Sequence, residues 1–259
     1  VVGCSTVTDR LMRDKEYKHK VLNFLGVEKL PVDGIAVRLT GFMGPNGFVL
    51  PFMLALPSYR FMDKDKGGVT EGMGSLVVYP TEEEKLSKTL LPFEAFLLKA
   101  RYIGPFTLGL SLKEDLWSIT SVDTDLVPEN ILAGAELFAT SLFAFLFGLV
   151  ENKPATVWAG VGMSVVTSLP PWPWSGTILG PKQPIDVPRE AVKHFSLGDP
   201  RLGVLGIATA KGKDIREVRR RVYRTVRNSV KSLDVQYRED IGIIQERDLQ
   251  TLKEWGWLA

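Results

Sequence analysis

Apolar residues recur along this chain with the alternation typical of strands in some stretches and with helical spacing in others. Apolar runs at residues 32–42 and 48–56 flank Gly44-Pro45-Asn46-Gly47, whose Pro-Asn-Gly favours a tight turn, so the two runs predict a β-hairpin. Residues 105–112 and 116–122 predict a second hairpin. Further strands are predicted at residues 76–79, 155–167 and 204–209.

Helical spacing of apolar residues predicts helices at residues 5–25, 81–100, 131–150 and 214–233. The third stretch is long enough to span a membrane, but Glu136 interrupts it, and we therefore expect a buried core helix in a protein without a membrane span. In the fourth, Asp214 is the predicted N-cap. Valines on one side of that helix oppose a row of arginines on the other: Arg216, Arg219, Arg220, Arg224 and Arg227.

This arginine row has two interpretations. It could contact the phosphates of a nucleic acid, or it could be a solvated helix face. No aromatic residues interleave with the arginines, and the net charge of the 259-residue chain is only +2. We therefore favour the solvated face over a nucleic-acid partner.

Cysteine and histidine are scarce in this chain. The single cysteine, Cys4, excludes an intrachain disulfide framework and suits a reducing compartment, so we expect a cytoplasmic protein. His19 and His194 lie far from Cys4 in sequence, which argues against a Cys/His zinc site. Nothing resembles a signal peptide, and the start at Val-Val-Gly suggests a processed, truncated or incomplete N-terminus.

Two predicted loops could serve a site. Residues 60–79 contain four glycines between apolar flanks, which suits a ligand-binding loop, but an ordinary connection fits equally well because no P-loop or dinucleotide-binding motif is present. Residues 169–174 read Leu-Pro-Pro-Trp-Pro-Trp. They are either a rigid packing loop or an aromatic wall over a site or a partner protein.

Residues 204–242 combine a strand, a Gly-containing turn, a helix carrying Tyr223 and the closing motif Tyr237-Arg238-Glu239-Asp240-Ile241-Gly242. This segment resembles the C-terminal end of the phosphoribosylamine–glycine ligase family, ATP-grasp enzymes of purine biosynthesis. Looser similarities to that family follow in matching order, at Val2-Gly3, residues 10–17, residues 25–27, Phe61-Met62-Asp63, the loop at residues 65–74 and Pro170-Pro171-Trp172-Pro173.

The resemblance implies an α+β fold. Residues 1–153 would form an ATP-grasp-like core, an antiparallel sheet with helices, and residues 154–259 a small C-terminal α/β domain of the ligase type. It also implies that a small ligand binds the glycine-rich loop, at Gly67, Thr70, Glu71, Met73 and Gly74.

The chain also departs from the family pattern. The family's N-terminal substrate domain, expected before Val2, is absent, and residues 26–34 leave no room for the small ATP lobe that holds the nucleotide phosphates. Val69 replaces an asparagine of the family's loop. We therefore expect both the N-terminal domain and the small ATP lobe to be missing.

The expected metal site is altered as well. Thr120 stands where the resemblance implies a magnesium-binding glutamate. Asp123 and Asp125 could still bind a cation through their carboxylates, although an Asp-x-Asp on a loop is commonly a turn or a cap.

Three functions follow from the resemblance. The first is a divergent relative without ordinary ATP-dependent ligase activity, which binds a small amino-acid or phosphoribosyl-like ligand; an ATP-independent transfer is one activity open to it. The second is a working ATP-dependent carboxylate–amine ligase, with ATP and Mg²⁺ as cofactors. The third is a non-catalytic structural or assembly protein that acts as a homo-oligomer or with a partner protein. No catalytic residue is identified.

Overall fold

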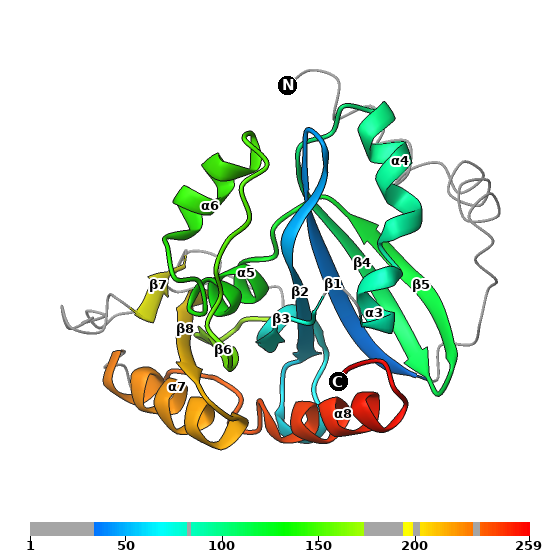
Figure 1. Cartoon of the computed structure of the whole chain (residues 1–259). Coiled ribbons are helices and arrows are strands. Elements are labelled where there is room, and N and C mark those ends of the chain that lie inside the picture. The colour runs from blue at the N-terminus through cyan, green and yellow to red at the C-terminus, as the bar shows by residue number, and fades with distance from the viewer. Residues whose placement is uncertain (1–33, 82–83, 174–193, 199–202, 230–233) are drawn as a thin grey trace.

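The computed structural model in Figure 1 describes residues 34–81, 84–173, 194–198, 203–229 and 234–259. Eight strands form one sheet in the order β5-β4-β1-β2-β3-β6-β8-β7, and every pair of neighbours is antiparallel. The strands are β1 (Ile35–Gly44), β2 (Gly47–Arg60), β3 (Val69–Val78), β4 (Gly104–Lys113), β5 (Leu116–Asp123), β6 (Val161–Ser168), β7 (Phe195–Leu197) and β8 (Val204–Gly212).

Both predicted hairpins are confirmed. β1 and β2 join where Gly44 pairs with Gly47, so that Pro45 and Asn46 make the turn. β4 and β5 join where Lys113 pairs with Leu116. Short-range turn chemistry therefore identified these two connections correctly.

Helices cover both faces of the sheet. Alternate residues of a strand point to opposite faces, and accordingly Leu54 and Leu56 of β2 lie in one hydrophobic core while Met53 and Ala55 lie in the other. The first core is completed by α3 (Lys85–Lys88), α4 (Leu91–Lys99), α7 (Ile215–Ser229) and α8 (Ile243–Glu254). The second is completed by α5 (Pro128–Ala135) and α6 (Leu142–Leu149). This architecture is α+β, as predicted.

Two predicted helices are each interrupted. Residues 81–100 form α3 and α4, which are separated at Thr89 and Leu90, although the apolar positions predicted to be buried are buried. Residues 131–150 were predicted to be one helix and instead contribute to α5 and α6. Between them, Phe138 bridges to Val157, and the side chain of Ser141 accepts a hydrogen bond from the N–H of Ala144 at 3.1 Å, which caps a new helix.

The other strand and helix predictions had mixed outcomes. Residues 155–160 are not part of the predicted strand, since β6 begins at Val161. β8 extends to Gly212, past the predicted turn at 210. Asp214 caps α7 as predicted, because its side chain accepts a hydrogen bond from the N–H of Glu217 at 2.8 Å. Helix α8 was not predicted. The helix predicted at residues 5–25 lies outside the described residues, as does the end of the one predicted to reach residue 233.

Within the described parts of the chain, no helix combines the length and apolar character that crossing a membrane requires. The sheet passes without interruption through the predicted domain boundary at residues 153 and 154, because β6 pairs with β3. The division into two domains at that point stays a prediction.

Candidate functional site

Most of the glycine-rich stretch is a strand rather than a loop. Only the segment before β3 is irregular, and it includes a short 3₁₀ turn, η1 (Asp63–Asp65). The turn is closed by a backbone hydrogen bond from the N–H of Phe61 to the carbonyl of Gly68 at 3.0 Å, and the guanidinium of Arg60 donates to the carbonyl of Gly67 at 3.1 Å. The stretch therefore has a compact, well-defined connection between β2 and β3.

The five predicted ligand-binding residues have different surroundings. Met73 is fully buried in the core. Gly74 has a φ of +142°, and a Cβ there would collide with the backbone carbonyl oxygen of Ser164 on β6. Gly67 is buried, and a Cβ there would lie 2.6 Å from the backbone nitrogen of Met62. These three positions serve packing, whereas Thr70 is partly exposed and Glu71 is exposed.

The closing Tyr-Arg-x-Asp-Ile-Gly motif holds η1 in place. The guanidinium of Arg238, only 1% exposed, donates to Asp240 at 2.7 Å and 2.8 Å, to Asp65 at 2.6 Å and to the carbonyl of Arg60 at 3.0 Å. In return, the N–H of Lys64 donates to Asp240 at 2.7 Å. The motif thus fixes the turn that leads into β3. It supports the structure close to the predicted ligand-binding residues.

A polar strip crosses the opposite side of the sheet from the first core. Arg38 on β1 pairs in register with Gly109 on β4, which in turn pairs with Ser121 on β5. Residues paired in this way point to the same face. Because Gly109 has no side chain, the Arg38 guanidinium reaches across β4 and donates to Asp123 at 2.6 Å. Its other terminal nitrogen donates to the hydroxyl of Tyr59 at 3.4 Å.

Glu129 of α5 carries the second charged group of this strip. It is 6% exposed and lies over Gly72 of β3, where a Cβ would collide with its carboxylate. Burial raises the pKa of Glu129, and the charge of Glu71 raises it further, while a backbone hydrogen bond and the charge of Arg38 lower it. Within the described residues, Oε1 of Glu129 has no hydrogen-bond partner, and neither has Nε of Arg38.

We call Arg38, Tyr59, Glu71, Ser121, Asp123 and Glu129 the polar strip. It contains one arginine and three carboxylates. Of its two buried atoms without a partner among the described residues, one is a hydrogen-bond donor and the other an acceptor. A buried donor or acceptor left without a partner costs about 1–3 kcal/mol. A ligand that brings both an anionic group and an amine would satisfy both atoms.

The geometry gives the predicted metal site no support. Asp123 already accepts hydrogen bonds from Arg38 and, at 2.9 Å, from Ser121, so a cation there would compete with a guanidinium. Asp125 is exposed beyond the end of β5. In the parts of the chain that the structure describes, no group of three or more His, Cys, Asp or Glu is arranged to hold a metal ion. The residues present therefore do not fit Mg²⁺, and no step is assigned to it.

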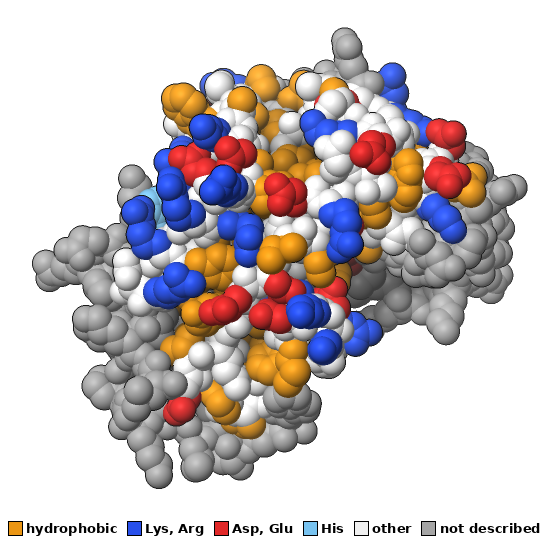
Figure 2. Space-filling model, turned by 90° about the horizontal axis from the view of Figure 1, so that it is seen from below, with side chains coloured by type: hydrophobic (Ala, Val, Ile, Leu, Met, Phe, Trp, Pro, Cys, Tyr) orange, Lys and Arg blue, Asp and Glu red, His pale blue; other side chains and the backbone are white. Residues whose placement is uncertain are grey.

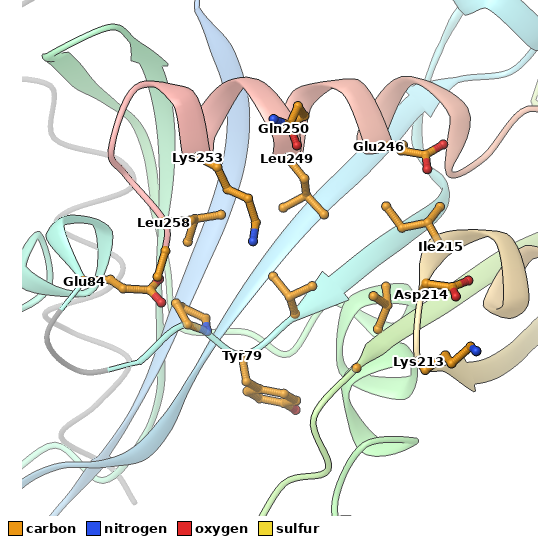
Figure 3. A pocket seen from close by; sticks show the side chains of 15 residues that line it. Tyr79, Glu84, Lys213, Asp214, Ile215, Glu246, Leu249, Gln250, Lys253 and Leu258 are labelled. Atoms are coloured by element: carbon orange, nitrogen blue, oxygen red, sulfur yellow. The ribbon is translucent and has the colours of Figure 1, made fainter.

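A pocket of about 440 Å³ lies elsewhere, between the end of β3 and helices α7 and α8 (Figure 3). The ammonium group of Lys253 points into it from α8, and Glu84 and Tyr79 lie across from that helix. Burial raises the pKa of Tyr79, whose hydroxyl has no partner among the described residues. None of the seven predicted site residues lines this pocket.

Arg38, Tyr59 and Glu129 were not predicted from the sequence. Arg38 had a recognisable signal, because it is the only charged residue in the otherwise apolar strand Ile35–Gly44. Glu129 had none, since an acidic residue in the first turn of a helix is ordinary. Asp123 was predicted, and the structure brings it to Arg38 rather than to a cation.

Comparison with known proteins finds matches among solved structures alone. No family model matches the chain, and no curated protein matches it. Phosphoribosylamine–glycine ligase from Thermotoga maritima is similar with a TM-score of 0.57 and 20% identity, over 81% of this chain and 56% of that one. Urea carboxylase from Kluyveromyces lactis is similar with a TM-score of 0.59 and 11% identity, over 95% of this chain and 22% of that one.

The urea amidolyase of K. lactis gives a TM-score of 0.60 at 11% identity, over 96% of this chain and 15% of that one. This chain therefore spans little more than half of the matched ligase and a smaller share of the other two proteins. Identities this low support a common fold. The chain thus has the fold of the ATP-grasp enzymes, which confirms at the level of the fold the resemblance to phosphoribosylamine–glycine ligase.

Proposed function

We propose that this protein is a divergent relative of phosphoribosylamine–glycine ligase that binds a small amino-acid or phosphoribosyl-like ligand on the polar strip. The observation that carries the proposal is a pair of buried atoms with no hydrogen-bond partner among the residues that the structure describes, the donor Nε of Arg38 and the acceptor Oε1 of Glu129. A ligand carboxylate or phosphate would accept from Arg38, because a guanidinium presents donors in the planar geometry these anions match. An amine on the ligand would pair with Glu129.

The neighbouring residues of the strip support this assignment. Tyr59 and Asp123 hold the Arg38 side chain from two directions, so that little conformational entropy remains to be lost on binding. At the start of β3, Glu71 acts on the pKa of Glu129, and the hydroxyl of Thr70 donates to the carbonyl of Tyr59 at 2.7 Å. Of the predicted ligand residues, these two are therefore retained as contributors, and Gly67, Met73 and Gly74 as the framework behind them.

We infer that ordinary ATP-dependent ligation is not performed by these residues. Activation of a carboxylate by phosphoryl transfer depends on cationic groups and Mg²⁺ placed around the polyphosphate. Thr120 stands where a metal-binding glutamate would be expected, and Asp123 is engaged by Arg38. The strip is compatible with a reaction of the bound ligand that requires no ATP, and equally with binding alone. We place this activity in the cytoplasm.

A second candidate is a structural or assembly role. Phe143 and Phe147 on α6 and Val150 at its C-cap are 73%, 78% and 62% exposed, and their spacing places them on one side of the helix. Exposed apolar stripes of this kind mark interaction surfaces in many proteins. A working ATP-dependent carboxylate–amine ligase is the third candidate, supported by the name of the matched Thermotoga protein.

Thermal unfolding with added ligands separates the three candidates. Glycine, ribose 5-phosphate and ATP with Mg²⁺ are tested one at a time, because binding to the folded state raises the melting temperature by mass action. The proposal predicts a rise with glycine or ribose 5-phosphate that is lost in Arg38→Gln. Lys253→Gln, which changes the separate pocket, is the matched control and keeps the rise.

Other outcomes of the same experiment contradict the proposal. A rise with ATP and Mg²⁺ that Arg38→Gln does not affect would favour the working ligase. A rise with glycine that is lost in Lys253→Gln alone would move the ligand to the pocket. If no compound changes the melting temperature and the protein self-associates with rising concentration, the assembly role is favoured.

A further inference from the structure

Four arginines form an exposed stripe along α7. They are Arg216, Arg220, Arg224 and Arg227, and we call them the arginine stripe. At 100° per residue they fall within a single narrow sector of the helix, opposite the buried side formed by Val218, Val222 and Val226. Figure 2 shows Lys and Arg side chains gathered over this side of the molecule.

The stripe differs from the other arginines of α7 in having no partners. Arg219 donates to the carbonyls of Ile241 at 2.9 Å and Glu239 at 3.2 Å. Arg221 pairs with Glu217 at 2.8 Å and donates to the carbonyl of Lys211 at 2.8 Å. Among the described residues, no carboxylate or carbonyl pairs with any member of the stripe. Of the five arginines in the predicted row, Arg219 therefore has a structural role, and the four of the stripe have no partner among the described residues.

This arrangement opposes helix stability. Like charges at i,i+4 destabilise a helix by about 0.2–0.5 kcal/mol per pair, and the stripe contains two such pairs, Arg216 with Arg220 and Arg220 with Arg224. Arg216 also lies in the first turn, where the positive end of the helix dipole disfavours a cation. A solvated face needs no such concentration of one charge, whereas a polyanion would relieve the repulsion.

We infer that the arginine stripe binds the phosphate backbone of a double-stranded nucleic acid. From Arg216 to Arg227 the stripe extends about 16 Å, the length of about five phosphates along one strand of a duplex. Guanidinium groups bind phosphates through paired hydrogen bonds. No aromatic residue lies within the stripe, which favours contact with the backbone over stacking on bases, and binding without sequence preference. This inference is independent of the polar strip.

Fluorescence anisotropy with a labelled mixed-sequence DNA duplex tests the inference on the full chain. Arg220→Gln/Arg224→Gln removes two charges from the stripe, and Lys88→Gln/Lys99→Gln removes two exposed charges from α3 and α4, away from α7 (Figure 1). Near 100 mM salt we expect the stripe variant to bind about 10- to 100-fold more weakly, and the slope of log affinity against log salt to become shallower by about 1.8. The control variant should bind like the wild type.

The melting temperature of the stripe variant provides a check on folding. Because the substitutions remove like-charge repulsion, it should equal or exceed that of the wild type. The inference is overturned if the wild type does not bind the duplex at low salt, or if both variants lose affinity equally. Binding to phosphatidylserine vesicles without binding to the duplex would also overturn it, in favour of a membrane surface.

Discussion

At the scale of single residues, the polar strip depends on two charged groups that are buried and incompletely paired. Arg38 is held by Asp123 and Tyr59, and Glu129 is held over Gly72, yet Nε of Arg38 and one carboxylate oxygen of Glu129 have no partner in the described part of the chain. Most buried polar groups in native proteins are hydrogen-bonded, so unpaired ones require an explanation. The proposed ligand, which would pair with both groups, is such an explanation.

Glu129→Gln should change how stability depends on pH. Burial raises the folded pKa of Glu129, so the contribution of this residue to stability is fully present below the unfolded pKa, about 4.3, and is lost as the pH rises through the folded value. The variant lacks this decrease. In urea unfolding without ligand, the wild type and the variant should have equal free energies of unfolding at acidic pH, and the variant should be the more stable at neutral pH. A variant that is less stable at neutral pH would contradict the assigned environment.

Arg238→Met should destabilise the protein by about 3–5 kcal/mol, because removing one partner of a buried ion pair leaves the other uncompensated. Burial alone would raise the pKa of Asp240, but Arg238 and the N–H of Lys64 bring it below its ordinary value. The pair therefore stabilises the wild type above about pH 4 and is lost at lower pH. Urea unfolding measures both effects, with exposed Arg216→Met as the control. A loss below about 1 kcal/mol would refute this role.

At the scale of elements, local rules predicted what local chemistry decides. The two hairpins, the cap at Asp214 and the buried side of α7 follow from turn residues, capping and periodicity. The failures lie where distant contacts intervene. The single apolar helix at residues 131–150 is interrupted by the bridge from Phe138 to Val157, and the glycine-rich segment becomes β3 because it pairs with both β2 and β6.

The same limit applies to the site. Asp123 and the start of β3 were predicted, but their neighbours Arg38 and Glu129 come from β1 and α5, and only the order of strands in the sheet brings them together. A periodic pattern contains no information about that order. The positive φ of Gly74 could not be predicted either, because the sequence does not show which of several neighbouring glycines requires that backbone conformation.

Gly74→Ala should destabilise the sheet by about 2–5 kcal/mol, through positive φ and overpacking together. The new Cβ would collide with the carbonyl oxygen of Ser164, so β3 and β6 would have to separate locally. Gly68→Ala, in the same segment with no atom within 4 Å of the added Cβ, is the matched control. Equal free energies of unfolding for the two variants would show that the close approach of β3 to β6 is absent.

At the scale of the whole molecule, one sheet carries its two proposed surfaces on different elements. The polar strip crosses β1, β4 and β5 and is joined by Glu129 of α5, which lies over β3, whereas the arginine stripe lies on α7, which packs against β8 and β6. The fold is shared with ATP-grasp enzymes, but function resides in the site that a fold carries. Our proposal is that this site recognises a small ligand and does not handle a triphosphate.

Isothermal titration calorimetry with glycine and with ribose 5-phosphate, in two buffers of different ionisation enthalpy, tests the central claim most directly. The account predicts that a ligand carrying an amine binds the wild type and releases protons, because pairing with the amine lowers the raised pKa of Glu129. Binding should be lost in Arg38→Gln and retained in Lys253→Gln. No binding of either compound to the wild type, or equal binding to Arg38→Gln, would contradict it.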